Sequence, residues 1–213
     1  MDHQQQQIQE IDIEQPQLKW DSSIDTLLAK WCDEAKCFEW MHAETQTLCD
    51  SAVRWYIIVS NCLTAFSGLS NVIVGGYTLN GFQLAWVFGG LSILVSTLNI
   101  LQDKLGFAQN GAIHKRLVSS WAILISKLEE ILILPYSSRK DCKTFLKYIK
   151  ADINQAKLDG ASLIPKPIRS SCYEKFRMIE GFNIPDICGQ VEHTRQYNSK
   201  DSYTVRLLDT IKN

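Results

Sequence analysis

Apolar residues in the first part of the chain recur with alternating spacings of four and three. The rhythm runs without a break from Ile24 to Ala52. A spacing of this kind places its members on one face of a helix and is typical of a coiled-coil seam. Asp21 comes just before the pattern and suits the N-cap of that helix. The positions are Ile24, Leu28, Trp31, Ala35, Phe38, His42, Thr45, Cys49 and Ala52.

The same rhythm returns in the middle of the chain, between residues 107 and 131. Pro135 predicts where this second helix ends, because proline lacks the backbone N–H that a helix needs. Gly106 and Gly111 predict a bend near its start. The sequence therefore predicts two long helices that pack against each other. The second seam consists of Phe107, Asn110, His114, Leu117, Trp121, Leu124, Leu128 and Ile131.

The segment between these patterns, residues 55–102, has no Asp, Glu, Lys or Arg in 48 consecutive positions, although 21% of the chain is charged. About 20 apolar residues in a helix suffice to cross a bilayer. Residues 55–76 and 82–101 each reach that length, so we expect two membrane spans. Burial in a soluble core is the alternative, but a chain of 213 residues has little room for two such helices.

A glycine-rich turn joins the two predicted spans, and aromatic rings mark their ends. Tryptophan and tyrosine prefer the membrane interface, and basic residues favour the cytosolic side. With no basic residue in the turn, both termini are expected in the cytosol. The turn residues are Gly75, Gly76, Asn80 and Gly81; the interfacial rings are Trp55, Tyr77 and Trp86; the flanking basic residues are Arg54, Lys104, Lys115 and Arg116.

Small and polar residues form one stripe along each predicted span. Such stripes let membrane helices approach closely and form hydrogen bonds between them. We expect them to hold the hairpin or neighbouring copies together; the alternative is that several copies turn them towards a water-filled pore. The stripe residues are Ser60, Thr64, Ser67 and Asn71 in the first span, and Ala85, Gly89, Ser92, Ser96 and Asn99 in the second, leading to Asp103.

Two pairs of residues are expected to meet across the hairpin. Arg54 and Asp103 border the uncharged block at the same depth, which predicts an interfacial ion pair. His42 and His114 lie 12 and 11 residues from these borders, so both fall roughly 17 Å below the membrane. They predict a polar layer in the seam, either a hydrogen-bonded pair that sets the register or a pH or metal switch.

The remaining segments divide the chain further. Residues 1–20 are polar and predicted to be flexible, residues 21–134 form the long hairpin, and residues 135–190 form a small cytosolic helical tail. Within the tail, Phe145, Ile149 and Ile153 predict an amphipathic helix that Gly160 ends. Residues 191–213 are weakly patterned.

Charge and motifs exclude several function classes. Residues 1–54 carry a net charge of −7 and residues 103–213 a net charge of +6, which suggests that the two arms attract each other. No basic and aromatic pattern typical of nucleic-acid binding is present. No catalytic, cofactor-binding or metal-binding motif is found, and the seven cysteines are irregularly spaced, as expected of reduced thiols. We therefore expect no enzyme, no cofactor and no small-molecule substrate.

Several stretches resemble the SLATT group of two-helix membrane proteins with cytosolic helical flanks. They are CFEWMHAETQTLCDSAVRWYIIVSNCLTAFSGLSN, GGLSILVSTLNILQDKLGFAQNGAIHKRLVSSW, FLKYIKADINQAKLDGASLIPKPIRSSCYEKF and NIPDIC, which together cover roughly residues 25–190. The order and spacing look most similar to versions encoded by large nucleocytoplasmic DNA viruses. The resemblance implies that His42 and His114 occupy motif positions. Bacterial members are proposed to be pore-forming effectors beside nucleotide-signalling partners.

The sequence thus predicts an all-α membrane protein. Two transmembrane helices form a hairpin that extends into a cytosolic antiparallel coiled coil, followed by a small helical C-terminal tail. The expected role is that of a non-enzymatic, self-associating, viral membrane protein of a host or virion membrane, with the lipid bilayer and further copies as partners. The alternative is an oligomeric, pore-forming SLATT-type effector.

Overall fold

The protein is helical throughout nearly all of its described length. The structure, a computed structural model, describes residues 18–74, 78–79, 82–83 and 85–189, and omits the side chains of 71–74, 78–79, 82–83 and 85. The described residues are helices apart from one very short β-hairpin and connecting segments. The all-α part of the predicted fold class is therefore confirmed. Predictions about residues 1–17 and 190–213 lie outside the described residues.

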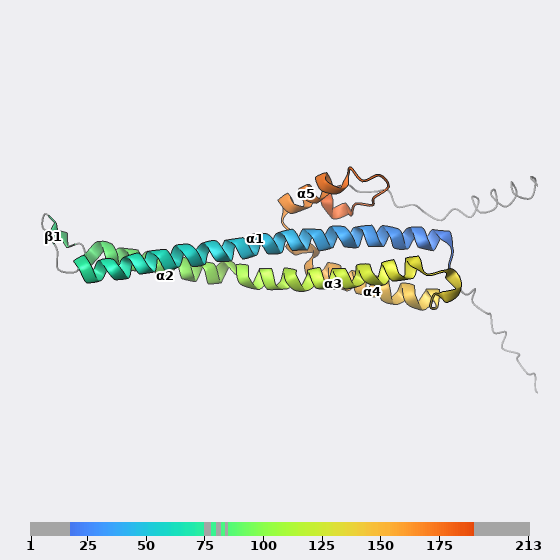
Figure 1. Ribbon diagram of the computed structural model, residues 1–213, viewed down its shortest axis with the longest axis horizontal. Helices are drawn as coiled ribbons and strands as arrows, with labels where there is room; N and C mark the ends of the chain where they lie inside the picture. Colours follow the sequence, from blue (N-terminus) through green and yellow to red (C-terminus); the bar gives the residue numbers. More distant parts are fainter. Residues whose placement is uncertain (1–17, 75–77, 80–81, 84, 190–213) are drawn as a thin grey trace, which may run out of the picture.

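One helix, α1, runs along the whole body of the molecule (Figure 1). It extends over Ser22–Val74, and its 53 residues correspond to a length of about 80 Å. It begins where predicted, because Asp21 Oδ1 accepts a hydrogen bond from the Ile24 backbone N–H at 2.9 Å. Capping of this kind satisfies one of the free N–H groups of the first turn.

Two successive helices, α2 (Ala85–Leu105) and α3 (Phe107–Ile133), return along α1 (Figure 1). Gly106 separates them with a φ of 62°, a left-handed conformation that residues with a side chain rarely adopt. The bend predicted at this point is therefore present. Beyond it, the Asn110 N–H donates to the Gly106 carbonyl at 2.9 Å, so that helical bonding resumes at once.

A minimal β-hairpin joins α1 to α2 at the far end of the molecule. Strands β1 (Thr78–Leu79) and β2 (Phe82–Gln83) are antiparallel, with Thr78 opposite Gln83. The chain therefore reverses in the predicted region. The turn residues predicted there lie outside the described residues: Gly75, Gly76, Tyr77, Asn80 and Gly81.

The tail places helices on both sides of the long hairpin. After the 3-10 turn η1 (Tyr136–Ser138), α4 (Cys142–Gly160) packs along α3. The turn η2 (Ala161–Leu163) then leads to α5 (Lys166–Phe176) and η3 (Asp186–Cys188). Figure 1 shows α5 on the side of α1 opposite α3. The first half of α1 is therefore covered on two faces.

The core follows the predicted seam. From Ile24 to Thr45 its members are buried, apart from the half-buried Trp31, and from His114 to Ile131 they are buried without exception. Phe38 stacks on Trp121 with ring centroids 4.8 Å apart. Helix α4 adds Ile149 and Ile153 to this core, as its predicted apolar stripe requires.

The membrane spans of the predicted fold class find no support in the structure. Within the described part of the chain, no helix combines the length and the apolar character needed to cross a membrane. Both predicted spans, 55–76 and 82–101, continue into residues 71–85, whose side chains lie outside that part.

Candidate functional site

A pair of histidines forms a polar layer in the middle of the apolar seam. His42 on α1 and His114 on α3 approach with their Nδ1 atoms 2.8 Å apart. Their rings are tilted by 39° at a centroid distance of 5.0 Å, and both residues are buried. The structure thus brings together the two histidines that the sequence predicted to be neighbours. His42 lies 12 residues before Arg54, and His114 lies 11 residues after Asp103, so the two histidines are at similar distances from the uncharged segment.

The contact fixes the protonation of the pair. Two Nδ1 atoms can share a hydrogen bond only if one carries the proton and the other offers its lone pair. Burial, followed by repulsion from His114, lowers the pKa of His42 from 6.5 to about 4. Burial also lowers the pKa of His114. Both rings are therefore neutral at pH 7, and the layer is a hydrogen-bonded pair without net charge.

One atom of the layer lacks a partner. The Nε2 atom of His42 is buried and makes no hydrogen bond in the structure. A buried polar atom without a partner costs about 1–3 kcal/mol, so a specific reason for it is expected. This atom faces the end of α4, where Gly160 packs against the ring.

Polar side chains hold the upper hairpin together from the inside. Ser60 Oγ on α1 donates to Asn99 Oδ1 on α2 at 2.8 Å. Farther along, Ser67 Oγ lies 3.0 Å from Ser92 Oγ and donates to the Phe88 carbonyl at 3.3 Å. Ser60 and Ser67 are both buried. Four of the predicted stripe residues therefore connect the two helices.

The other stripe residues do not contribute to this contact. Thr64 and Ser96 are exposed, and each hydroxyl donates to a backbone carbonyl of its own helix, at 2.8 and 3.0 Å. A Cβ atom on Gly89 would have no heavy atom within 4 Å, so this glycine allows no close approach within the chain. The stripes are therefore not continuous in the hairpin contact within one chain, and the predicted contact between neighbouring copies stays a prediction. The side chain of Asn71 lies outside the described residues.

The ion pair predicted between Arg54 and Asp103 does not form. Arg54 Nη2 instead donates to Ser51 Oγ at 3.2 Å, one turn earlier on the same helix. Both charged residues are exposed, whereas Val53 and Tyr56 beside them are half-buried. Their positions at the two borders of the uncharged segment were therefore not enough to predict an ion pair between them.

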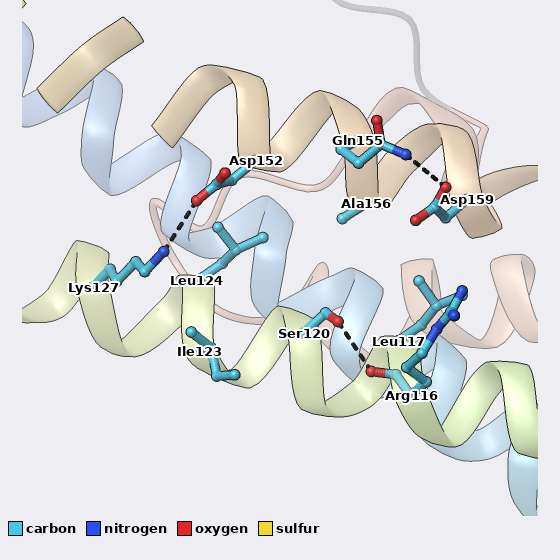
Figure 2. A pocket seen from close by; sticks show the side chains of 10 residues that line it. All are labelled: Arg116, Leu117, Ser120, Ile123, Leu124, Lys127, Asp152, Gln155, Ala156 and Asp159. Carbon is cyan, nitrogen blue, oxygen red and sulfur yellow. Dashed lines mark hydrogen bonds and ion pairs between the residues drawn. The ribbon is translucent and has the colours of Figure 1, made fainter. Parts of the chain in front are cut away.

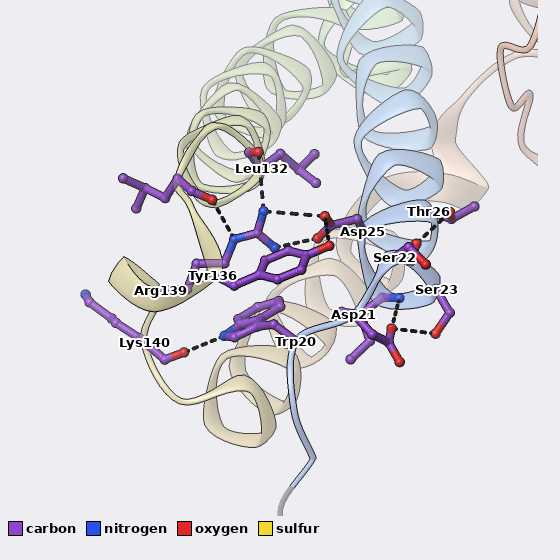
Figure 3. Close-up of polar contacts among 12 residues, drawn as sticks. Trp20, Asp21, Ser22, Ser23, Asp25, Thr26, Leu132, Tyr136, Arg139 and Lys140 are labelled. Atoms are coloured by element: carbon purple, nitrogen blue, oxygen red, sulfur yellow. Dashed lines mark hydrogen bonds and ion pairs between the residues drawn. The ribbon is translucent and has the colours of Figure 1, made fainter. Parts of the chain in front are cut away.

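A polar cluster closes the opposite end of the bundle (Figure 3). Arg139 follows the 3-10 turn, and its side chain is only 3% exposed. Its guanidinium donates to both carboxylate oxygens of Asp25 near the start of α1. It also donates to the carbonyls of Leu134 and Leu132, at 2.9 and 3.4 Å, which are free because α3 ends there.

Aromatic rings complete this cluster. The guanidinium lies 5.0 Å from the Trp20 ring centroid and 4.7 Å from that of Tyr136. The Tyr136 hydroxyl donates to Asp25 at 3.0 Å, and the Trp20 indole N–H donates to the Lys140 carbonyl at 2.8 Å. The hydrogen bond from Arg139, followed by that from Tyr136, lowers the pKa of Asp25. The cluster thus joins the start of α1 to the end of α3 and to the segment before α4, and its role is structural.

Figure 2 shows a groove between α3 and α4. Its cavity of about 250 Å³ lies against Leu117, Leu124 and Ala156. Lys127 bridges it to Asp152 at 3.0 Å, and Gln155 donates to Asp159 at 2.8 Å. Since these four polar side chains are engaged in pairs, they do not converge on a common point as the groups of a catalytic site would.

Sulfur atoms gather where α5 and η3 cover α1. Cys37, Cys172 and Cys188 are buried, and the Cys188 thiol lies 3.8 Å from Met41 Sδ. A hydrogen bond with Cys188 favours the Cys172 thiolate, but the contact with Cys37 and burial outweigh it and raise the pKa of Cys172 to about 12. The contact with Cys172 and burial likewise raise the pKa of Cys188, so Cys172 and Cys188 stay protonated. All three side chains pack as small apolar groups. All seven cysteines are free.

No metal centre is found among the residues that the structure describes, since no three His, Cys, Asp or Glu side chains there are grouped to hold an ion. The metal form of the histidine switch therefore gains no support. No protein-family model matches the chain, and neither a curated protein nor a solved structure matches it. A function can therefore be inferred only from the described side chains.

Proposed function

We propose that residues 55–102 lie in a lipid bilayer as a two-pass hairpin with both termini on the cytosolic side. In this proposal the protein is a non-enzymatic, self-associating membrane component. The observation that carries it is the inverted polarity of α1 and α2. Serine and asparagine side chains lie between the two helices, while large apolar side chains point outwards.

Large apolar side chains are exposed along both helices. Phe66 is 61% exposed and Ile93 is 70% exposed. Soluble monomers rarely expose an apolar patch of more than a few hundred Å². A lipid environment would remove this surface from water. The exposed apolar residues of the segment are Trp55, Ile57, Ile58, Val59, Phe66, Leu69, Trp86, Val87, Ile93, Leu94, Ile100 and Leu101.

The inner contacts support the same proposal. In lipid there is no hydrophobic force between helices, so hydrogen bonds such as that from Ser60 to Asn99 are what membrane helices use to associate. The hydroxyls of Thr64 and Ser96 donate to carbonyls of their own helices, so these two donors need no water on the outer surface. Trp55 and Trp86, both exposed, would sit at the two interfaces.

A paired experiment tests the membrane location. Lysine at the centre of a membrane span costs about 2.5–3.5 kcal/mol. We expect the full-length protein to resist alkaline carbonate extraction from cell membranes, and Ile93→Lys to increase the extracted fraction. Ile123→Lys is the matched control, because Ile123 is 58% exposed but lies in the cytosolic stalk. Equal extraction of both variants, or release of the unaltered protein without detergent, contradicts the proposal.

Self-association is the favoured role because the outer apolar surface of the hairpin carries small residues, which let membrane helices approach closely. Glycines on that surface, Gly68, Gly89 and Gly90, have no neighbour within 4 Å of a Cβ position and so leave room for a second copy. The resemblance to SLATT proteins adds a viral origin and a host or virion membrane to this proposal. Chemical cross-linking in nanodiscs should give discrete oligomers larger than one chain.

The alternative is a pore, favoured by the exposed hydroxyl of Ser96 one turn from Asn99. Dye leakage from liposomes that contain the purified protein distinguishes the two roles. Leakage that is lost in Ser96→Leu/Asn99→Leu, but kept in the stalk control Ser119→Leu/Ser120→Leu, supports the pore. Absence of leakage at every protein concentration supports the organising role.

A further inference from the structure

Three helices meet at the histidine layer. Besides His42 and His114, the last residue of α4, Gly160, is buried there. A Cβ atom on Gly160 would lie 2.3 Å from Leu117 Cδ1 and 2.9 Å from His42 Cε1. Both distances are shorter than a van der Waals contact, so a side chain at this position would force Leu117 or the His42 ring to shift. The end of α4 therefore closes directly over the imidazole of His42.

Gly160 covers the fully buried nitrogen of the layer that has no partner. The Cβ position of Gly160 is 3.1 Å from His42 Nε2, and this nitrogen makes no hydrogen bond. A neutral ring tolerates this arrangement better than a charged one, because an imidazolium carries an N–H on both nitrogens. One N–H would point at His114, while the other would point at Gly160 and find no acceptor.

No nearby charge compensates for a proton on the pair. On α4, Lys157 pairs with Glu34 of α1 at 2.9 Å, and the exposed Asp159 accepts a bond from Gln155. On α3, Lys115 and Arg116 are exposed and would repel an imidazolium. On α1, the half-buried Glu39 lies one turn from His42, but burial and His114 are the only influences on the pKa of His42.

The end of α4 itself carries partial negative charge, which attracts cations. However, no carbonyl of this end accepts a hydrogen bond from His42 Nε2. The Ala161 N–H is bonded to the Lys157 carbonyl, which closes the last turn on itself. A proton on Nε2 would therefore need water to solvate it. The packing of Gly160 against the ring keeps water away from this nitrogen.

We propose that the His42–His114 pair is an acid-operated latch, in which protonation of the pair releases the end of α4, and with it η2 and α5, from the α1–α3 stalk. This inference does not depend on the membrane proposal. It identifies a regulator for the protein: the pH around its tail. Release of this segment would expose Leu117 and Ala156, which now line the groove between α3 and α4.

The direction of the pH dependence follows from the lowered pKa values. In the closed state the pKa of His42 is about 4, whereas a released histidine has a pKa near 6.5. The closed state is therefore fully favoured above pH 6.5 and loses stability as the pH falls towards 4. At pH 5 the released histidine is mostly protonated and the closed one is not, so the opening constant rises about 30-fold.

Hydrogen–deuterium exchange of the full-length protein in nanodiscs tests the latch. After correction for intrinsic exchange, amides of residues 153–164 should exchange about 30-fold faster at pH 5 than at pH 7.5. Amides of residues 121–131 on α3 should keep their protection. The acceleration should disappear in His42→Leu/His114→Leu and persist in the control His193→Leu, which removes a histidine outside the described residues.

Several outcomes overturn the proposal. They are an unchanged exchange rate at pH 5, an equal acceleration in the double variant, and a simultaneous loss of protection in α3 that marks global unfolding. Should the double variant not fold, His114→Gln replaces it, since glutamine keeps a hydrogen bond to His42 but does not titrate. Gly160→Ala provides an independent check and should exchange fast at residues 153–164 already at pH 7.5. Full protection in that variant refutes the role of Gly160.

Discussion

Replacement of Arg139 by alanine should destabilise the whole tail. The guanidinium makes hydrogen bonds to Asp25 and to two free carbonyls at the end of α3, and it is nearly inaccessible to water. Removal of one partner from a buried ion pair typically costs 3–5 kcal/mol. Because the Asp25 side chain is 29% exposed, water solvates part of its charge. We therefore expect the lower end, about 3 kcal/mol.

Urea denaturation in mild detergent, followed by tryptophan fluorescence, measures this loss as a change in the free energy of unfolding. Arg177→Ala is the matched control. Its guanidinium is 44% exposed and pairs with Glu174 at 2.8 Å on the surface, so its removal should cost less than about 0.5 kcal/mol. A loss below about 1 kcal/mol for Arg139→Ala, or equal losses in the two variants, would show that the cluster does not join the helices.

Three further substitutions or reagents test other contacts. Asn99→Leu removes the acceptor of the Ser60 hydroxyl and should weaken the hairpin by about 1 kcal/mol, measured as a lower midpoint of unfolding in detergent; an unchanged midpoint contradicts an internal polar contact. Lys127→Ala breaks a pair with Asp152 in which both side chains are about half exposed. Its free energy of unfolding should therefore stay within about 0.5 kcal/mol of that of the unaltered protein. Cys62 is exposed within the uncharged segment, and a water-soluble maleimide should label it in denatured protein but not in intact membranes, as mass spectrometry can verify.

Local patterns were sufficient to predict the stalk. The seam spacing decides which residues of α1 and α3 face each other, and a heptad pattern depends only on neighbours along the same helix. His42 and His114 were placed together because each lies at a countable distance from the uncharged segment. Gly106 was recognised as a bend for a similar reason, since its backbone freedom is a property of the residue itself.

Contacts that depend on rotation about a helix axis were not predictable in this way. Arg54 and Asp103 border the uncharged segment, but Arg54 bonds to Ser51 on its own helix and not to Asp103. The burial of Cys37 and Met41 depends on the docking of α5 and η3 against α1. Both are apolar residues outside the predicted seam, and this was the only sign in the sequence that a second face of α1 is covered. Gly160 was predicted to end a helix, but its contact with His42 depends on where that helix packs.

One face of α1 contacts the returning helices both before and after Tyr56. The residues on that face are mostly apolar before Tyr56, whereas serines make the contacts after it. Below this point Phe38 and Leu28 face α3, and charged residues such as Lys36 lie towards solvent. Above it Ser60 and Ser67 face α2, and apolar side chains lie outside. Burial of apolar area stabilises the lower half in water by about 25 cal/mol per Å², whereas the same term opposes the upper half in water. We infer that the two halves need different solvents, and that the ring contact of Tyr56 with Phe107, 6.0 Å between centroids, marks the boundary between them.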